Sequence, residues 1–70
     1  MNKFAKRLVE LRTQSGLSQL GLSREISIAQ PTIANWERGF REPSFDTLIK
    51  LAEFFDVTTD YLLGRDGFDI

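Results

Sequence analysis

The chain has 70 residues, no cysteine, no histidine and a formal net charge of −1. This length allows one domain with one small core. The missing cysteines exclude a disulfide framework and a cysteine nucleophile, and the missing histidines remove the commonest general base and metal ligand. No apolar run approaches the length of a membrane span. We therefore expect an unprocessed, soluble, cytoplasmic protein without a membrane partner, a metal or a cofactor.

The charged residues are unevenly distributed along the chain. Residues 1–41 carry seven basic side chains against three acidic ones, whereas residues 42–70 carry two basic against seven acidic. The nearly neutral total therefore combines a net charge of +4 in the first segment with −5 in the second. A basic segment favours a nucleic-acid partner, although a solvated helical surface with chance asymmetry explains the same distribution.

The first predicted helix covers residues 2–15 and starts from a cap at Asn2. Its apolar residues at helical spacing, which predict one buried face, are Phe4, Leu8 and Leu11. Gly16 suits the left-handed residue that ends a helix.

The second predicted helix begins at Ser18, whose hydroxyl can accept from the backbone N–H groups of the first turn. Leu22 and Ile26 lie one turn apart and predict its buried side. Gly21 leaves the cap without a reciprocal acidic partner and costs up to about 1 kcal/mol relative to alanine, so this helix should be the least stable of the set.

A tight turn at Ser27 joins this helix to the third one. A turn here needs a residue in the left-handed backbone conformation. For a serine, this conformation costs on the order of 1 kcal/mol. The third helix is predicted to begin near Gln30, because Pro31 is tolerated in a first helical turn. Ile33 and Trp36 are three residues apart and predict its buried side, so Trp36 is expected in the core.

Two further helices follow a linker at residues 40–43. Gly39 ends the third helix, Ser44 caps the fourth and Thr58 caps the fifth. Asp56, between the fourth and fifth helices, is expected to adopt the left-handed backbone conformation. The apolar residues expected to face the core from these helices are Leu48, Leu51, Ala52, Phe55, Tyr61, Leu62 and Leu63.

No strand pattern is present, so the predicted fold is all-α with five helices. We expect a helix-turn-helix motif at residues 18–37 within a domain at residues 1–64. A short tail at residues 65–70 follows Gly64.

Several short motifs occur in a characteristic order, namely Leu17-Ser18-Gln19, Leu22-Ser23, Ser27, Ala29-Gln30-Pro31-Thr32, Ile33, Glu37-Arg38-Gly39, Pro43-Ser44, Leu48, Leu51-Ala52 and Val57 to Leu63. In order and spacing they resemble the Cro and phage-repressor (XRE-type) helix-turn-helix family over about residues 3–64. The resemblance implies a five-helix bundle of the lambda-repressor-like DNA-binding type. Two positions depart from the family: Ser27 replaces the turn glycine, and Gly21 replaces the acidic residue that follows the cap.

The third helix turns polar side chains away from its buried side, and these are the candidates for reading base pairs: Gln30, Pro31, Thr32 and Asn35. A glutamine amide can pair bidentately with adenine N6 and N7 in the major groove. Pro31 suits a thymine methyl group and Thr32 a phosphate, although helix initiation and surface filling explain them equally well. Asn35 occupies a position that the resembling family uses for base or phosphate contacts.

Candidate phosphate ligands surround this helix: Gln19, Arg38, Arg41 and Arg12. Gln19 lies in the first turn of the second helix, where backbone N–H groups can hold a phosphate. Arg38 and Arg41 follow the third helix. The resemblance implies that Arg12 pairs with Glu37, which would fix the third helix and aim the guanidinium near a phosphate. Alternatively, Arg12 and Glu37 are two unrelated surface charges.

The remaining basic residues of the first segment, Lys3, Lys6, Arg7 and Arg24, are expected to be solvated. The acidic residues of the second segment are scattered through caps and tail, without a paired acid and base. We therefore expect no enzymatic activity.

The sequence predicts a regulator of transcription that binds duplex DNA sequence-specifically, and the resemblance implies repression. One recognition helix reads only a few base pairs, so a homodimer on a near-palindromic operator is expected, with half-sites about one helical turn apart. The candidate dimer residues, taken from leftover apolar surface, are Phe45, Thr59, Tyr61, Phe68 and Ile70.

The main alternative is a protein-interaction module of the same fold, such as an antitoxin or a coactivator-like bridge. Its docking surface would be the acidic second segment. The sequence leaves open the operator, any small-molecule effector, the choice between activation and repression, and whether these residues are a whole protein.

Overall fold

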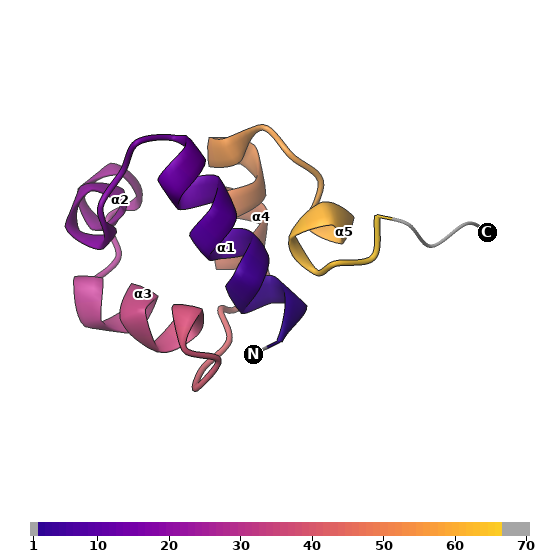
Figure 1. Cartoon of the computed structure of the whole chain (residues 1–70), viewed down its shortest axis with the longest axis horizontal. Helices are drawn as coiled ribbons and strands as arrows, with labels where there is room; N and C mark the ends of the chain where they lie inside the picture. The colour runs from indigo at the N-terminus through magenta and orange to yellow at the C-terminus, as the bar shows by residue number, and fades with distance from the viewer. Residues whose placement is uncertain (1, 67–70) are drawn as a thin grey trace.

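The computed structural model describes residues 2–66, which form five helices and no strand. The helices are α1 (Lys3–Gln14), α2 (Gln19–Ile26), α3 (Gln30–Glu37), α4 (Phe45–Phe55) and α5 (Thr59–Leu62). In Figure 1, α1 crosses the middle of the molecule, with α2 and α3 on one side, α5 on the other and α4 behind it. The predicted all-α, five-helix fold is confirmed, and α2 and α3 lie within the predicted helix-turn-helix segment.

Four helices begin at the predicted caps, where a side-chain oxygen accepts a backbone N–H of the first turn. The acceptor and donor residues are Asn2 and Ala5 (2.7 Å), Ser18 and Gly21 (2.9 Å), Ser44 and Thr47 (3.2 Å), and Thr58 and Tyr61 (2.9 Å). α3 has no side-chain cap, and Pro31 stands in its first turn. A proline loses no helical hydrogen bond there, because N–H groups of the first turn have no intrahelical partner.

Among residues 2–66, two non-glycine residues adopt the left-handed conformation, both where it was predicted. Ser27 ends α2 with φ 58°, and Asp56 ends α4 with φ 55°. An L-residue in this region costs on the order of 1–2 kcal/mol. Burial of Ile26 immediately before the Ser27 turn and of Ile33 after it offsets that cost.

The hydrophobic core is built from side chains of all five helices: α1 packs against α3 and α5, α2 against α3, and α4 against α2 and α5. Its fully or nearly buried residues are Phe4, Leu8, Leu11, Leu22, Ile26, Ile33, Trp36, Leu48, Leu51, Ala52 and Leu62. Trp36 packs edge-on against Phe4, with ring centroids 6.5 Å apart and an angle of 71° between the ring planes. Aromatic pairs favour this arrangement, so the contact anchors the rear of α3 to α1.

The prediction for one core residue is wrong. Leu63 was expected to face the core, but it is 41% exposed, whereas its neighbour Leu62 is fully buried. α5 is a single turn of four residues that ends at Leu62, so successive side chains point in different directions. Leu63 instead lines an apolar pocket of about 150 Å³, here called the Phe45 pocket, together with Phe4, Glu42, Pro43, Phe45 and Leu48.

Candidate nucleic-acid interface

α3 has a buried side and a solvent-accessible side, as the sequence predicts. Ile33 and Trp36 are buried against the rest of the molecule, and Pro31 is exposed on the other flank. Gln30 and Asn35 are partly exposed, so neither is enclosed in the interior. Thr32 is partly exposed as well, so all four side chains predicted to read bases are at least partly accessible to solvent.

Gln30 is held in place by a neighbouring glutamine from α2. Its amide Nε2 donates to Gln19 Oε1 at 2.7 Å, and Gln19 Nε2 in turn donates to Glu37 Oε1 at 2.9 Å. Two amides joined in this way have fixed orientations, because each donor has a defined acceptor. The side chain at the start of α3 is consequently connected to the carboxylate at its end.

Glu37 is the centre of this arrangement. Arg12 Nε donates to Glu37 Oε2 at 2.6 Å, and Arg12 Nη2 donates to Glu37 Oε1 at 3.0 Å. Arg12 Nη1 also donates to the Leu17 carbonyl oxygen at 2.8 Å, which ties the pair to the α1–α2 connection. We call Arg12, Gln19, Gln30 and Glu37 the Glu37 network. It links α1, α2 and α3 and confirms that Arg12 and Glu37 are paired rather than unrelated.

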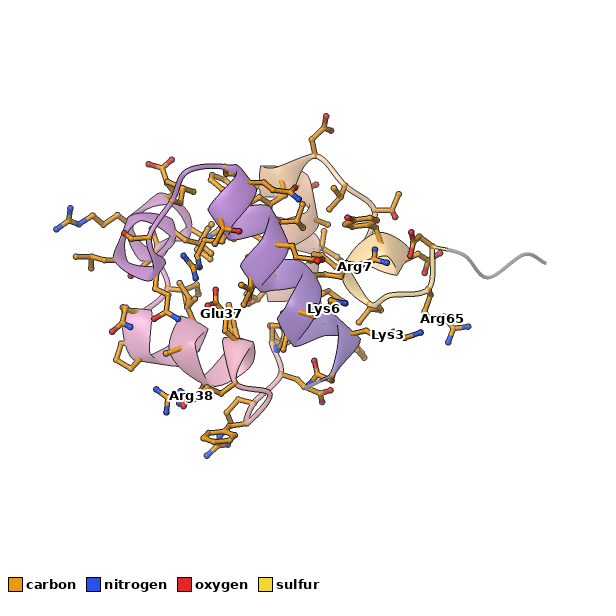
Figure 2. All side chains as sticks on the ribbon, viewed as in Figure 1. Lys3, Lys6, Arg7, Glu37, Arg38 and Arg65 are labelled. Atoms are coloured by element: carbon orange, nitrogen blue, oxygen red, sulfur yellow. The ribbon has the colours of Figure 1, made fainter. Side chains whose placement is uncertain are left out.

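The carboxylate of this network is withdrawn from solvent. Glu37 is only 6% exposed, and the Arg12 side chain is 14% exposed. Figure 2 shows Glu37 pointing from α3 towards the interior, whereas Arg38 points away from the body of the molecule. A buried carboxylate is tolerated only when it is paired and hydrogen-bonded, and Glu37 is both.

The two remaining basic candidates lie on the outside of the molecule. Arg38 and Arg41 are both exposed just beyond α3, on either side of Gly39, whose φ of 78° ends the helix. The guanidinium of Arg38 lies 5.7 Å from the centroid of the Phe40 ring. Phe40 is 69% exposed and was not among the predicted site residues, because no periodic pattern marks a residue in a linker.

Two residues that stabilise the turn were also missed. The hydroxyl of Ser23 donates to the Ile28 carbonyl oxygen, and the ammonium group of Lys50 donates to the Ile26 carbonyl oxygen. A serine inside a helix and a lysine on an acidic segment give no sequence signal of such contacts. Both follow from the way α2, the turn and α4 pack together.

Arg7 was predicted to be solvated, but its side chain is only 25% exposed and makes contacts that the sequence did not predict. Its guanidinium lies 4.1 Å from the centroid of the Tyr61 ring and donates to the Tyr61 carbonyl oxygen and to Asp66 Oδ1, both at 3.0 Å. The hydrogen bond between the two side chains raises the pKa of Arg7 and lowers that of Asp66. Arg7 therefore joins α1 to α5, while Lys3, Lys6 and Arg24 are exposed as expected.

The candidate dimer residues differ in accessibility. Phe45 is 85% exposed and lines the Phe45 pocket, and among the candidates that the structure describes it is the largest accessible apolar side chain. Thr59 and Tyr61 are half-buried. Phe68 and Ile70 lie outside the described residues.

The described residues contain no group of three or more acidic side chains that could hold a metal ion. Within the same part of the chain, no helix is long and apolar enough to cross a membrane.

The fold and this surface define a small all-α domain built around a helix-turn-helix motif. The protein family described as Helix-turn-helix matches residues 8–62, and the chain belongs to that family. The resemblance to Cro and phage repressors is thereby confirmed. Most of the core-forming residues fall within the matched range.

Known relatives are regulators of transcription. The chain is 43% identical over 63 residues to the HTH-type transcriptional regulator ImmR of Bacillus subtilis (strain 168), a match that covers 90% of this chain and 50% of ImmR. The chain thus spans about half the length of this relative. These relatives are regulators of transcription by name, and not enzymes.

Two solved structures are also similar. The P22 c2 repressor, crystallised with a synthetic operator, matches with a TM-score of 0.84 and 26% identity over 94% of this chain and 100% of that one. The restriction-modification controller protein C.AhdI from Aeromonas hydrophila matches with a TM-score of 0.77 and 38% identity, covering 86% of this chain and 91% of its own.

Proposed function

We propose that this chain is the DNA-binding part of a transcriptional regulator and that it recognises a specific duplex sequence through α3. The observation that carries the proposal is the Gln30 amide, which lies on the accessible flank of α3 and is oriented by Gln19. Only one Gln30 N–H is used in the contact with Gln19. The carbonyl oxygen and the second N–H then suit adenine, whose major-groove edge offers one donor and one acceptor.

Pro31, Thr32 and Asn35 extend this reading surface along the same helix. Pro31 suits a thymine methyl group, and Thr32 and Asn35 suit a phosphate or base edge. The buried Ile33 and Trp36 hold the helix from behind. The reading side chains are thus presented on a rigid element, which favours sequence discrimination over general attraction to DNA.

Phosphate contacts would fix the register of α3 on the duplex. Gln19 lies in the first turn of α2, where backbone N–H groups and the positive end of the helix dipole favour a phosphate. Arg38 and Arg41 supply exposed charge beyond the other end of α3. A guanidinium has five N–H donors, and Arg12 uses three of them inside the Glu37 network, so its contribution is mainly to hold α3 in place.

The regulator is proposed to act as a homodimer on a near-palindromic operator. One α3 helix reads too few base pairs to select a site in a genome, and two-fold symmetry doubles the number read. The exposed Phe45 beside its apolar pocket is the part of the described surface best suited to meet a second copy. Occlusion of a promoter by this dimer would repress transcription in the cytoplasm, and the operator-bound P22 c2 repressor supports this mode.

Selection of binding sequences from random duplex DNA tests the proposal directly. We expect a defined motif with dyad symmetry and half-sites about one helical turn apart. Absence of any enriched motif, with no salt-dependent binding to duplex DNA, would overturn the proposal. That result would favour the protein-interaction module of the same fold instead.

A pair of variants separates base readout from backbone contact. Gln30→Ala is expected to cost roughly 1–3 kcal/mol at one base pair of each half-site, because one bidentate pair is lost there. Arg41→Ala should weaken binding to all sequences alike and flatten the salt dependence by about one unit per phosphate lost. Competition with base-substituted operators measures the first effect, and a salt titration measures the second. If Gln30→Ala weakened binding equally on every operator variant, Gln30 would contact the DNA backbone rather than a base.

A further inference from the structure

Lys50 crosses from α4 to the end of α2. Its ammonium Nζ donates to the carbonyl oxygen of Ile26 at 2.6 Å, across 24 positions of sequence. Ile26 is the last residue of α2, and the next residue is the left-handed Ser27. The contact therefore falls at the turn of the helix-turn-helix motif.

The chemistry of this position suits a cation. The last carbonyl groups of a helix lack intrahelical donors and lie at the negative end of the helix dipole. A charged donor forms a shorter and stronger hydrogen bond with such a carbonyl than a neutral donor does. Lys50 is one of two basic residues in the otherwise acidic second segment, so its presence here is not explained by a general basic surface.

Two further contacts restrain the same turn. The backbone N–H of Ile28 donates to the Ser23 carbonyl oxygen at 3.2 Å, and the Ser23 hydroxyl donates back to the Ile28 carbonyl oxygen. These bonds fold the turn onto α2 but do not connect it to another helix. Lys50 adds that connection, because α4 belongs to the core through Leu48 and Leu51.

We propose that Lys50 is a positioning residue for the recognition helix. By holding the Ile26 carbonyl, it fixes the turn at Ser27 against α4 and so sets the direction in which α3 leaves the turn. The inference rests on the proposed function for its effect on DNA recognition. The restraint on the turn itself is independent of DNA.

Three variants isolate this role. Lys50→Met keeps the aliphatic stem but removes the donor, and Lys50→Arg restores a cationic donor. Lys6→Met is the matched control, because Lys6 is an exposed lysine on α1 and its loss changes the net charge equally. Lys50 is itself exposed, so Lys50→Met should keep its fold, which circular dichroism checks.

The first measurement needs no DNA. Amide hydrogen exchange at Ser27 and Ile28 is expected to become about tenfold faster in Lys50→Met, because a charge-assisted hydrogen bond is lost. It should stay within about twofold of the wild type in Lys50→Arg and Lys6→Met. Unchanged exchange in Lys50→Met would overturn the restraint, whatever the DNA measurement shows.

The second measurement is the ratio of affinities for the selected operator and for a scrambled duplex. Lys50→Met should lower this ratio about tenfold, since a misdirected α3 loses base contacts but keeps its charges. Lys6→Met should leave the ratio unchanged, and Lys50→Arg should largely restore it. If Lys50→Met lowered the affinities for both duplexes equally, and by as much as Lys6→Met does, Lys50 would act only through its long-range charge. If the wild-type protein bound neither duplex, the proposed function would fail, while hydrogen exchange would still decide the restraint.

Discussion

α1 carries two arginines, and each forms an ion pair with a carboxylate that is distant in sequence. We call these ion pairs the Arg12 junction and the Arg7 junction, and they differ in burial. Arg12 pairs with Glu37 of α3 at a site where the carboxylate side chain is 6% exposed. Arg7 pairs with Asp66 beyond α5, where the carboxylate side chain is 41% exposed. The same residue type on the same helix therefore makes one enclosed contact and one open contact.

The difference explains what each junction can do. Charges exposed to water are screened and contribute little to stability, whereas an enclosed pair becomes strongly destabilising once one partner is removed. The Arg12 junction also continues through Gln19 to Gln30, so it determines the orientation of the reading side chain. The Arg7 junction ends at Tyr61 and Asp66 and holds only α5 and the residues after it.

The largest effect is expected from breaking the enclosed junction. Glu37→Gln leaves the Arg12 guanidinium without its charge partner and should lower the free energy of unfolding by about 3 kcal/mol. Urea unfolding measures this loss. Glu53→Gln is the matched control, because Glu53 is an exposed glutamate on α4 and the same atoms change. Equal stabilities of the two variants would show that burial does not distinguish the Arg12 junction.

A smaller effect is expected from Arg7→Met, which keeps the aliphatic stem but removes the contacts with Tyr61 and Asp66. The midpoint of thermal unfolding should fall by less than in Glu37→Gln, because water replaces the lost partners. The ring protons of Tyr61 should shift in the NMR spectrum, since the guanidinium no longer covers that ring. Lys6→Met, one residue away, should change neither quantity. A loss as large as that of Glu37→Gln would contradict the comparison.

The smallest effect is expected from Asp66→Asn, and its size depends on pH. The hydrogen bond from Arg7 lowers the pKa of Asp66 below its ordinary value of 3.8. The pair therefore adds stability above that ordinary value and loses it as the pH falls through the lowered pKa of the folded state. At neutral pH the variant should therefore have a slightly lower unfolding midpoint than the wild type. In strong acid the two midpoints should converge.

Salt gives a second test of the open junction. In 1 M salt the difference between wild type and Asp66→Asn should shrink at neutral pH, because exposed charges are screened over about 3 Å. The Glu37→Gln deficit should largely persist under the same conditions. Equal sensitivity of both variants to salt would remove the distinction between the two junctions.

Local features of this protein were predictable because they depend on neighbouring residues. The caps at Asn2, Ser18, Ser44 and Thr58 bond to backbone groups three residues further along, so a short segment contains everything they need. The left-handed turn at Ser27 follows in the same way. Helical periodicity placed Ile33 and Trp36 in the core and thereby assigned the accessible flank of α3.

Apart from the Arg12–Glu37 pair, which the resemblance implied, the contacts between helices were decided by the tertiary structure. Residue types and spacing made Gln19 and Gln30 separate candidates, but their connection to each other and to Glu37 depends on how α2 meets α3. Lys50 and Arg7 gave no local signal, since their acceptors lie on other helices and beyond α5. Periodicity assigns a side chain to a flank of its own helix, whereas the packing of several helices determines which distant atom it meets.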